Sequence, residues 1–206
     1  MNTMKRNIGI NAFGKAVKRF FDFWGALLSL IVFSPVFLVI YVAIIKEDGQ
    51  PAIFKQRRVG YKGKEFTLYK FRSMRTDAEI AGKPELCKEN DNRLTKVGRF
   101  IREHHVDELP QLWNVLKGEM SFVGPRPERR YFVEKIMEHN PDYELLYQLR
   151  PGLFSIATLY NGYTDTMEKM LERLRLDLEY LSNWSLWLDL KIIFLTAYSI
   201  LSGKKF

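Results

Sequence analysis

The sequence predicts a helix-rich α+β protein that is partly embedded in a membrane, for three reasons. Residues 23–45 form one apolar run without a charge, residues 53–74 have the pattern of a β-hairpin, and most of the remaining chain shows helical periodicity. The length of 206 residues suits one domain with a hydrophobic core. We expect a lead-in segment over residues 1–22, a membrane helix over 23–45 and a membrane-associated domain over 46–206, which together form one functional unit.

Composition excludes several classes of protein. Apolar residues make up 47% and charged residues 27% of the chain, which excludes a disordered sequence. The single cysteine, Cys87, excludes a disulfide framework, and three histidines with one cysteine exclude a zinc finger. The formal net charge is +8, and residues 1–75 hold 14 basic but only 4 acidic side chains. The positive excess therefore surrounds the apolar run.

The apolar run has 23 residues, the length of a transmembrane helix. A cleaved signal peptide fits poorly because basic residues flank both ends. Such clusters favour the cytoplasmic side, so a simple span would carry one of them across the bilayer. Ser34-Pro35 lies at the middle of the run, where proline interrupts a helix and a serine hydroxyl can satisfy a freed backbone group.

This break favours a re-entrant helix whose two ends lie on the same side of the membrane. Each half of the run gives about 16 Å of helix against a hydrocarbon core of about 30 Å. A single span that is kinked at Pro35 remains the alternative. Ahead of the run, Phe13, Val17, Phe20 and Phe21 recur at helical spacing, continued by Trp24 within it, with basic residues opposite, which predicts an interfacial amphipathic helix.

Residues 53–74 are predicted to form a β-hairpin that turns at Gly60 and Gly63. Seven basic residues from Lys55 to Arg72 could lie on anionic lipid or point into a phosphate site. We expect no nucleic-acid partner, because no recognition module is visible beside the membrane segment. The polar residues 77–92 are expected to form a surface loop, which could be a lid or a plain connector.

The next helix is predicted by Leu109, Leu112 and Leu116, which share one face, and by Gly118, which ends it. Asp107 then falls at the N-cap and Glu108 in the first turn. Acidic residues at a helix start could simply cap the helix and complement its dipole.

The surrounding residues favour chemistry over capping. Arg99 and Arg102 precede the acidic pair, and Arg126 follows in a Gly-Pro-Arg-Pro segment whose prolines fix the backbone. Arginine binds phosphate with two parallel hydrogen bonds, and paired carboxylates suit Mg²⁺, which brings substrate phosphates with it. On a membrane anchor, this set indicates phosphoryl transfer that involves a lipid.

Several segments together resemble the bacterial sugar transferases, which are monotopic polyprenyl-phosphate phosphoglycosyltransferases. They are Lys18–Asp22, Ser34-Pro35, Tyr69–Met74, Leu94–Arg102, Asp107–Pro127 and Arg150–Gly152. The resemblance runs from about residue 14 to residue 202, in order, and its central motif is 21 contiguous residues. It implies the minimal catalytic form of that family.

The resemblance implies a two-step reaction at the cytoplasmic face of the bacterial inner membrane. Asp107 would attack the phosphoryl group next to the sugar of a UDP-sugar, UMP would leave, and polyprenyl (undecaprenyl) phosphate would take the phosphosugar. Glu108, with Asp107, would hold Mg²⁺. The residues expected to bind substrate phosphate are Arg102, Arg126, Lys70 and Arg72. Further candidates for the lining of the site are Arg99, Arg150 and Asp177.

The product would start a surface glycan such as a capsule, exopolysaccharide, O-antigen or glycoprotein glycan. Besides the substrates, membrane lipid and downstream glycosyltransferases are the expected partners. The runner-up function is an inactive membrane adaptor that binds anionic lipid or other glycan enzymes. The intact set of Asp107, Glu108, Arg102 and Arg126 argues against it, because a binding module does not need these residues.

Two departures from the family pattern are visible. His104-His105 stands where many members have Thr-Ser, and these histidines could touch the substrate or take part in acid–base chemistry, or could simply be exposed or capping. Leu153–Gly162 replaces a segment that is different in many members, and if that region reads the nucleotide-sugar, similarity does not give the donor.

The tail predicts two more helices. In the first, Asp177 shares an apolar face with Leu174 and Leu181, so its carboxylate is either paired or lining a site. The second, residues 184–201, is predicted to be interfacial, because it is short and carries two charges near its start.

Overall fold

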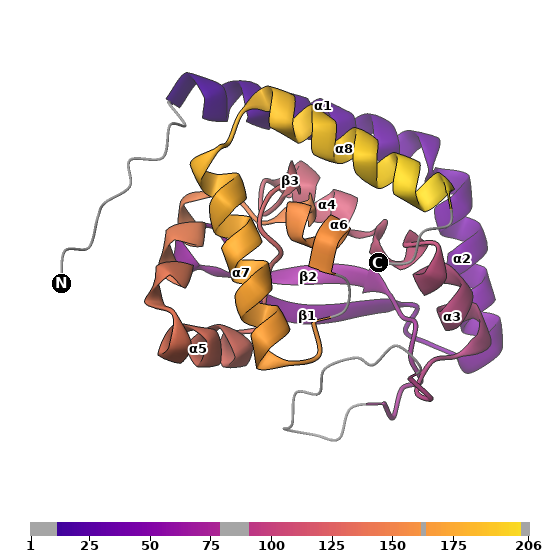
Figure 1. The fold of residues 1–206 in the computed structure, drawn as a ribbon. Coiled ribbons are helices and arrows are strands. Elements are labelled where there is room, and N and C mark those ends of the chain that lie inside the picture. The colour runs from indigo at the N-terminus through magenta and orange to yellow at the C-terminus, as the bar shows by residue number, and fades with distance from the viewer. Residues whose placement is uncertain (1–11, 79–90, 162–163, 203–206) are drawn as a thin grey trace.

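The structure, a computed structural model, describes residues 12–78, 91–161 and 164–202. A hairpin of two strands crosses the lower part of the view in Figure 1, and helices lie above it and at its two ends. Strand β1 (Ile53–Val59) pairs antiparallel with β2 (Glu65–Phe71), from Ile53 opposite Phe71 to Val59 opposite Glu65. The turn includes η1 (Tyr61–Gly63), where Lys62 and Gly63 have φ angles of 58° and 69°. The predicted hairpin is confirmed.

The apolar run is interrupted at the predicted position. Helix α1 (Ala12–Val32) is followed by α2 (Ser34–Asp48), and the two are bent by 61°. Ser34 Oγ donates to the carbonyl of Ile31 at 2.7 Å, which satisfies a backbone group beside the break. The expected lead-in and the first half of the run form one helix. Within the described residues, length and hydropathy would permit only the bent pair to cross a bilayer, and no helix by itself.

Helix α1 is attached to the body of the protein by polar contacts. Arg19 donates to the carbonyls of Val115 and Leu116 at 2.6 and 2.7 Å. Asp22 is buried and accepts hydrogen bonds from Ser121 Oγ and Phe122 N, each at 3.0 Å. The helix therefore forms part of the support for the segments that carry the site.

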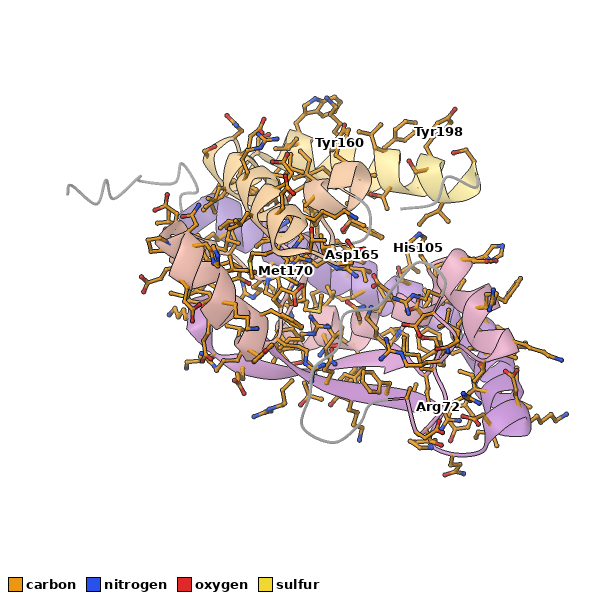
Figure 2. The ribbon with its side chains drawn as sticks, turned by 60° about the horizontal axis from the view of Figure 1, so that its bottom comes forward. Arg72, His105, Tyr160, Asp165, Met170 and Tyr198 are labelled. Atoms are coloured by element: carbon orange, nitrogen blue, oxygen red, sulfur yellow. The ribbon has the colours of Figure 1, made fainter. Side chains whose placement is uncertain are left out.

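Helix α8 (Leu186–Leu201) lies in front of α1 in the view of Figure 1 and is joined to it by the ion pair between Lys18 and Asp189. It keeps Trp187, Phe194 and Tyr198 more than 60% exposed, and Tyr198 points away from the body of the protein (Figure 2). Asp189 points inward instead, where Lys18 Nζ lies 2.5 Å from its carboxylate. These exposed apolar side chains are typical of an interfacial helix.

The remaining elements form the larger part of the core. They are α3 (Lys96–Glu103), η2 (Val106–Glu108), α4 (Gln111–Lys117), α5 (Arg130–His139), η3 (Pro141–Gln148), α6 (Ile156–Asn161) and α7 (Met167–Ser182). A short parallel pair, β3 (Ser121–Val123) and β4 (Gly152–Phe154), joins residues that are distant in the sequence, and the sequence did not predict it. A Cβ on Gly152 would lie 2.1 Å from Gly124 N, so this close approach requires glycine.

Candidate active site

A cavity of about 460 Å³ opens between the hairpin, η2, the turn after β3, and helices α6 and α7. Nine basic and three acidic side chains are among those that line it, a formal excess of six positive charges. The acidic residues are Asp107, Glu108 and Glu128. Such an excess attracts anions, because low-dielectric walls focus the field of the charges.

The acidic pair lies in a turn, which corrects its expected place at a helix start. Helix α3 ends at Glu103, His105 has a left-handed φ angle of 56°, and η2 follows directly. Helix α4 begins only at Gln111, with Pro110 in the capping position. The sequence rule failed here because a left-handed residue and a 3₁₀ turn separate the two helices. In a 3₁₀ turn, neighbouring side chains point about 120° apart, so the two carboxylates can face different partners.

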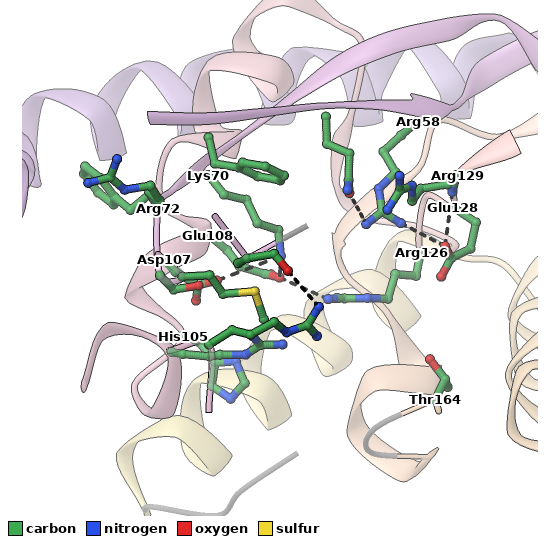
Figure 3. Close-up of a pocket in the computed structure, with 18 of the residues that line it drawn as sticks. Arg58, Lys70, Arg72, His105, Asp107, Glu108, Arg126, Glu128, Arg129 and Thr164 are labelled. Carbon is green, nitrogen blue, oxygen red and sulfur yellow. Dashed lines mark hydrogen bonds and ion pairs between the residues drawn. The ribbon is translucent and has the colours of Figure 1, made fainter. Parts of the chain in front are cut away.

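Two cationic side chains donate hydrogen bonds to the carboxylate of Glu108. Its Oε1 accepts from Lys70 Nζ at 2.6 Å and from Arg126 Nη2 at 3.1 Å (Figure 3). Burial favours the neutral acid, but the attraction of Lys70 and Arg126 outweighs it and lowers the pKa of Glu108. Glu108 is therefore a fixed anion between two cations.

Asp107 has a different environment. It is 6% exposed, and Lys70 Nζ lies 3.9 Å from its Oδ2. Among the described residues, none donates a hydrogen bond to this carboxylate. Burial, with the nearby charge of Glu108, raises the pKa of Asp107 to about 6, against the lowering effect of Lys70 and Arg102. At neutral pH, Asp107 is thus an ionised carboxylate with little hydrogen bonding.

Arg126 is held in place from behind. Its side chain reaches Glu108, and its backbone N–H donates to Asp177 Oδ2 at 3.3 Å. Asp177 also accepts from Ser155 Oγ at 3.1 Å, and burial raises its pKa to about 7. Asp177 is not among the residues that line the cavity, so it supports the Arg126 turn instead of lining the site.

The other predicted residues divide into two groups. Lys70, Arg102 and Arg72 line the cavity, as the phosphate-binding prediction required. The Nη2 of Arg72, however, donates to the carbonyls of Asp48 and Gly49 at 3.0 and 2.7 Å, which ties β2 to the end of α2. Phosphate binding by Arg72, like that by Lys70, Arg102 and Arg126, stays a prediction.

Arg99 and Arg150 lie outside the cavity, which corrects the proposal that they line it. Arg99 is exposed on α3, because its neighbours Gly98 and Ile101 face the core. Arg150 donates to the carbonyl of Gly118 at 2.8 Å and lies over the ring of Tyr61. The Arg-Pro-Gly motif thus closes the end of α4 and positions β4.

Sequence reasoning missed several residues of the cavity wall. Glu128 and Arg129 directly follow the Gly-Pro-Arg-Pro segment, a proximity that could have marked them. Arg58 was included only in a general basic cluster, and Arg173 gave no signal within its helix. His105 and Thr158 also line the cavity, so both departures from the family pattern contribute to it. Gly162 lies outside the described residues, as do Cys87 and most of the loop predicted at residues 77–92.

Two neighbouring carboxylates on the cavity wall suit a magnesium ion. In the described part of the chain, no cluster of three or more His, Cys, Asp and Glu side chains is present. Mg²⁺ commonly uses one or two carboxylates and completes its shell with water and substrate phosphate. Asp107 and Glu108 on an open cavity wall fit that incomplete protein shell.

Comparison with known proteins identifies the family to which this chain belongs. The model of the family described as bacterial sugar transferase matches residues 13–203. The chain is 44% identical to the UDP-glucose:undecaprenyl-phosphate glucose-1-phosphate transferase of Klebsiella pneumoniae, over 92% of this chain and 41% of that protein. It is 40% identical to the UDP-N-acetylgalactosamine-undecaprenyl-phosphate N-acetylgalactosaminephosphotransferase of Aeromonas hydrophila, over 91% of this chain and 44% of that protein.

A shorter relative is covered more completely. The UDP-glucose:undecaprenyl-phosphate glucose-1-phosphate transferase of Caulobacter vibrioides is 40% identical over 90% of this chain and 70% of that protein. The chain thus spans less than half the length of the relatives from Klebsiella and Aeromonas. Relatives with similar identity are named for different sugars, so similarity does not select a donor.

Proposed function

Because the chain belongs to the bacterial sugar transferase family, we propose that its cavity transfers a sugar-1-phosphate from a UDP-sugar to a polyprenyl phosphate. The observation that supports this most strongly is that the two carboxylates of the acidic pair differ in their ion pairs and hydrogen bonds. Glu108 is neutralised by Lys70 and Arg126, whereas Asp107 lies beside them with few hydrogen bonds. A carboxylate that is ionised and poorly hydrogen-bonded suits a nucleophile.

In the first step, an Asp107 carboxylate oxygen attacks the phosphorus next to the sugar. A new P–O bond forms on Asp107, and the bond to the oxygen that bridges the two phosphoryl groups breaks. That oxygen keeps the electron pair and leaves as UMP. Arg126, Arg102 and Lys70 stabilise the phosphoryl oxygens, whose charge they partly neutralise.

In the second step, the phosphate of the lipid acceptor attacks the same phosphorus. Its oxygen forms the new P–O bond, and the Asp107 carboxylate is released. The product is a polyprenyl diphospho-sugar. The two steps share one anion-binding cavity, so only one of the two bulky anionic substrates has to be held at a time.

Glu108 and Asp107 would hold Mg²⁺, which would supply further neutralisation of phosphate charge when bound. Lys70 and Arg126 keep Glu108 ionised, and Asp177 fixes the position of the turn that carries Arg126.

Release of UMP tests this function. Purified protein in lipid nanodiscs should release UMP from at least one UDP-sugar in the presence of Mg²⁺, and turnover should require polyprenyl phosphate. A panel of donors would identify the sugar and, with it, narrow the glycan. If no donor gave UMP, the proposal would be contradicted, and the alternative function, an inactive membrane adaptor, would be favoured.

We further propose that the protein lies in the cytoplasmic leaflet, with both ends of the bent helix pair on the cytoplasmic side. The break at Ser34-Pro35 and the basic residues on both sides of the run support this topology. Cysteines at Asn2 and Gln50 should both stay unlabelled by an impermeant thiol reagent on intact spheroplasts. Labelling at Asn2 alone would show a true span.

A further inference from the structure

The end of helix α2 is bound to the segment that leads into the acidic turn. Glu47, in the last turn of α2, accepts hydrogen bonds from the backbone N–H groups of Lys96 at 2.7 Å and of Val97 at 2.9 Å. Lys96 and Val97 are the first two residues of α3, which lies beside α2 in Figure 1. Thr95 Oγ1 accepts from the N–H of Gly98 at 2.9 Å. Three N–H groups at the start of α3 thus have acceptors, and one side chain of α2 binds two of them.

Helix α3 connects this contact to the site. It contains eight residues, whereas an isolated helix in water needs about 12 or more, so α3 depends on its contacts with other elements. It carries Arg102, which lines the cavity, and Asp107 follows a short turn after its end. The helix is about 12 Å long, so a shift at its start is carried to the acidic turn.

A second link joins the same end of α2 to strand β2. Arg72 Nη2 donates to the carbonyls of Asp48 and Gly49 at 3.0 and 2.7 Å, and it lies 3.3 Å from Asp48 Oδ2. Arg72 is buried and follows two residues after Lys70, which contacts Glu108. Both segments that hold the acidic pair are therefore bound to the end of α2.

An apolar cluster fills the space between these two links. Ile44 of α2 is buried in it together with Phe71 of β2 and Ile101 of α3. Val106, the neighbour of Asp107 in the acidic turn, packs against the same cluster. Because close-packed side chains transmit displacement, a movement of α2 also displaces the residues that support the turn.

Helix α2 has another face that the body of the protein leaves exposed. Leu38 and Val39 lie on it, and each is more than 60% exposed. In the topology proposed above, this face contacts lipid. A membrane helix tilts or moves when the thickness of the bilayer does not match its apolar length. Such a movement of α2 reaches α3 through the hydrogen bonds of Glu47.

We propose that Glu47 is a positioning residue that makes the alignment of Asp107 depend on the position of α2 in the membrane. The inference rests on the proposed function, because alignment matters only if Asp107 attacks a phosphoryl group. Glu47 lies outside the cavity that the described residues form, so it acts through α3 and not on the substrate. A displacement of about 1 Å at a reacting group can lower the rate about a hundredfold, so a small shift of the turn is sufficient.

The test compares two substitutions of Glu47 in the full chain, reconstituted in nanodiscs. Glu47→Ala removes both acceptors, whereas Glu47→Gln keeps one acceptor oxygen. Glu47 is exposed, so neither substitution leaves a cavity in the core. The matched control is Ser185→Ala, because Ser185 Oγ accepts from the N–H of Leu188 at 3.1 Å and caps α8. The control loses a helix cap on another helix with exposed apolar side chains and leaves α3 unchanged.

UMP release measures the effect on the reaction. We expect kcat to fall about tenfold in Glu47→Ala and about threefold in Glu47→Gln, with the KM of the donor within about twofold of the wild-type value. Between nanodiscs with acyl chains of about 14 and about 18 carbons, the wild-type kcat should differ about threefold or more. Glu47→Ala should reduce that difference by about half or more, and Ser185→Ala should match the wild type in both measurements.

Hydrogen–deuterium exchange of residues 105–109 gives a readout that does not require activity. Exchange in this turn should be about fivefold or more faster in Glu47→Ala than in the wild type or in Ser185→Ala. Unchanged exchange in the turn would overturn the role of Glu47, and so would an equal dependence on acyl-chain length in Glu47→Ala and the wild type. If the wild type releases no UMP from any donor, the proposed function fails, and exchange alone decides whether Glu47 positions the turn.

Discussion

Two acidic regions on the same cavity wall use their carboxylates in opposite ways. At Glu128, both carboxylate oxygens accept hydrogen bonds, from Arg58, Arg173 and the backbone of Arg129. At the acidic turn, Glu108 is paired with Lys70 and Arg126, whereas within the part of the chain that the structure describes the nearest cation to Asp107 with which it forms an ion pair is Lys70, at 3.9 Å. The cavity therefore contains paired carboxylates that hold arginines in place and one carboxylate that remains available to react.

The largest expected effect follows from changing the available carboxylate. Asp107→Asn keeps the size of the side chain but removes the ionised oxygen, so UMP release and lipid transfer should fall by more than about a thousandfold. The protein should remain folded, because Asn does not bring a buried charge. Activity assays with a thermal unfolding curve check both statements. The exposed Asp165, changed to Asn in the same way, is the control and should keep its activity.

Asp177 tests whether a buried carboxylate behind the site behaves like Asp107. It is faced by Arg173 and Arg126 and by the phenols of Tyr143 and Tyr180. Burial raises its pKa to about 7, well above the ordinary value of an aspartate, so its contribution to stability is complete below pH 4 and is lost as the pH rises to about 7.

Asp177→Asn should abolish that loss, because the amide cannot ionise. The stability of the variant relative to the wild type should rise by up to about 4 kcal/mol between pH 4 and above pH 7. This rise adds to a loss that does not depend on pH, because Asn can accept from only one of Ser155 and Arg126. Unfolding midpoints between pH 4 and pH 8 measure it. A difference that does not change with pH would show that Asp177 is ionised throughout this range.

Glu128→Gln removes the carboxylate charge that pairs with Arg58 and Arg173. The substitution leaves Arg58 and Arg173 buried without their anion, which should cost about 3 kcal/mol of unfolding free energy. Chemical denaturation measures this cost, and Glu179→Gln on the exposed face of α7 is the control. If Glu128→Gln were as stable as the wild type, the ion cluster would not hold the wall together.

Arg126→Lys keeps the positive charge between the two regions but removes the planar guanidinium group, which can donate two parallel hydrogen bonds. We expect activity to fall by about a hundredfold with the fold retained, because a lysine cannot contact Glu108 and a phosphate in the same geometry. Steady-state kinetics give the value. Near-normal turnover would assign Arg126 to the structure of the turn alone.

The smallest effect in this series is expected from Glu108→Gln. The amide still accepts from Lys70 but no longer neutralises it, so we expect about a tenfold loss of rate and a higher requirement for Mg²⁺. A titration of activity with Mg²⁺ measures both changes. Equal losses for Glu108→Gln and Asp107→Asn would remove the distinction between the two residues.

The sequence predicted the elements that depend on local patterns. The hairpin, the break at Ser34-Pro35 and the end of α4 at Gly118 follow from alternation, proline and glycine, and all are present. Arg126 was predicted to bind phosphate from its Gly-Pro-Arg-Pro segment, and Lys70 from the basic hairpin and the family resemblance, and both contact Glu108.

The sequence could not predict what depends on distant contacts. Arg173 meets Glu128 only because α7 packs against the turn after β3, and no local pattern encodes that contact. The position of Asp107 in a 3₁₀ turn depends on the left-handed His105, which residue preferences do not require. Arg99 was misplaced because one turn of helix separates it from the cavity-lining Arg102, and it is the exposed residue of the two.

The most direct test of the account is the intact mass of the protein after incubation with its UDP-sugar and Mg²⁺ in the absence of lipid. We predict an added mass of one phosphosugar, which maps to Asp107 and disappears on addition of polyprenyl phosphate. The Asp107→Asn variant should show no added mass. An adduct that persists in that variant, or full activity without any adduct, would contradict the assignment of Asp107 as the nucleophile.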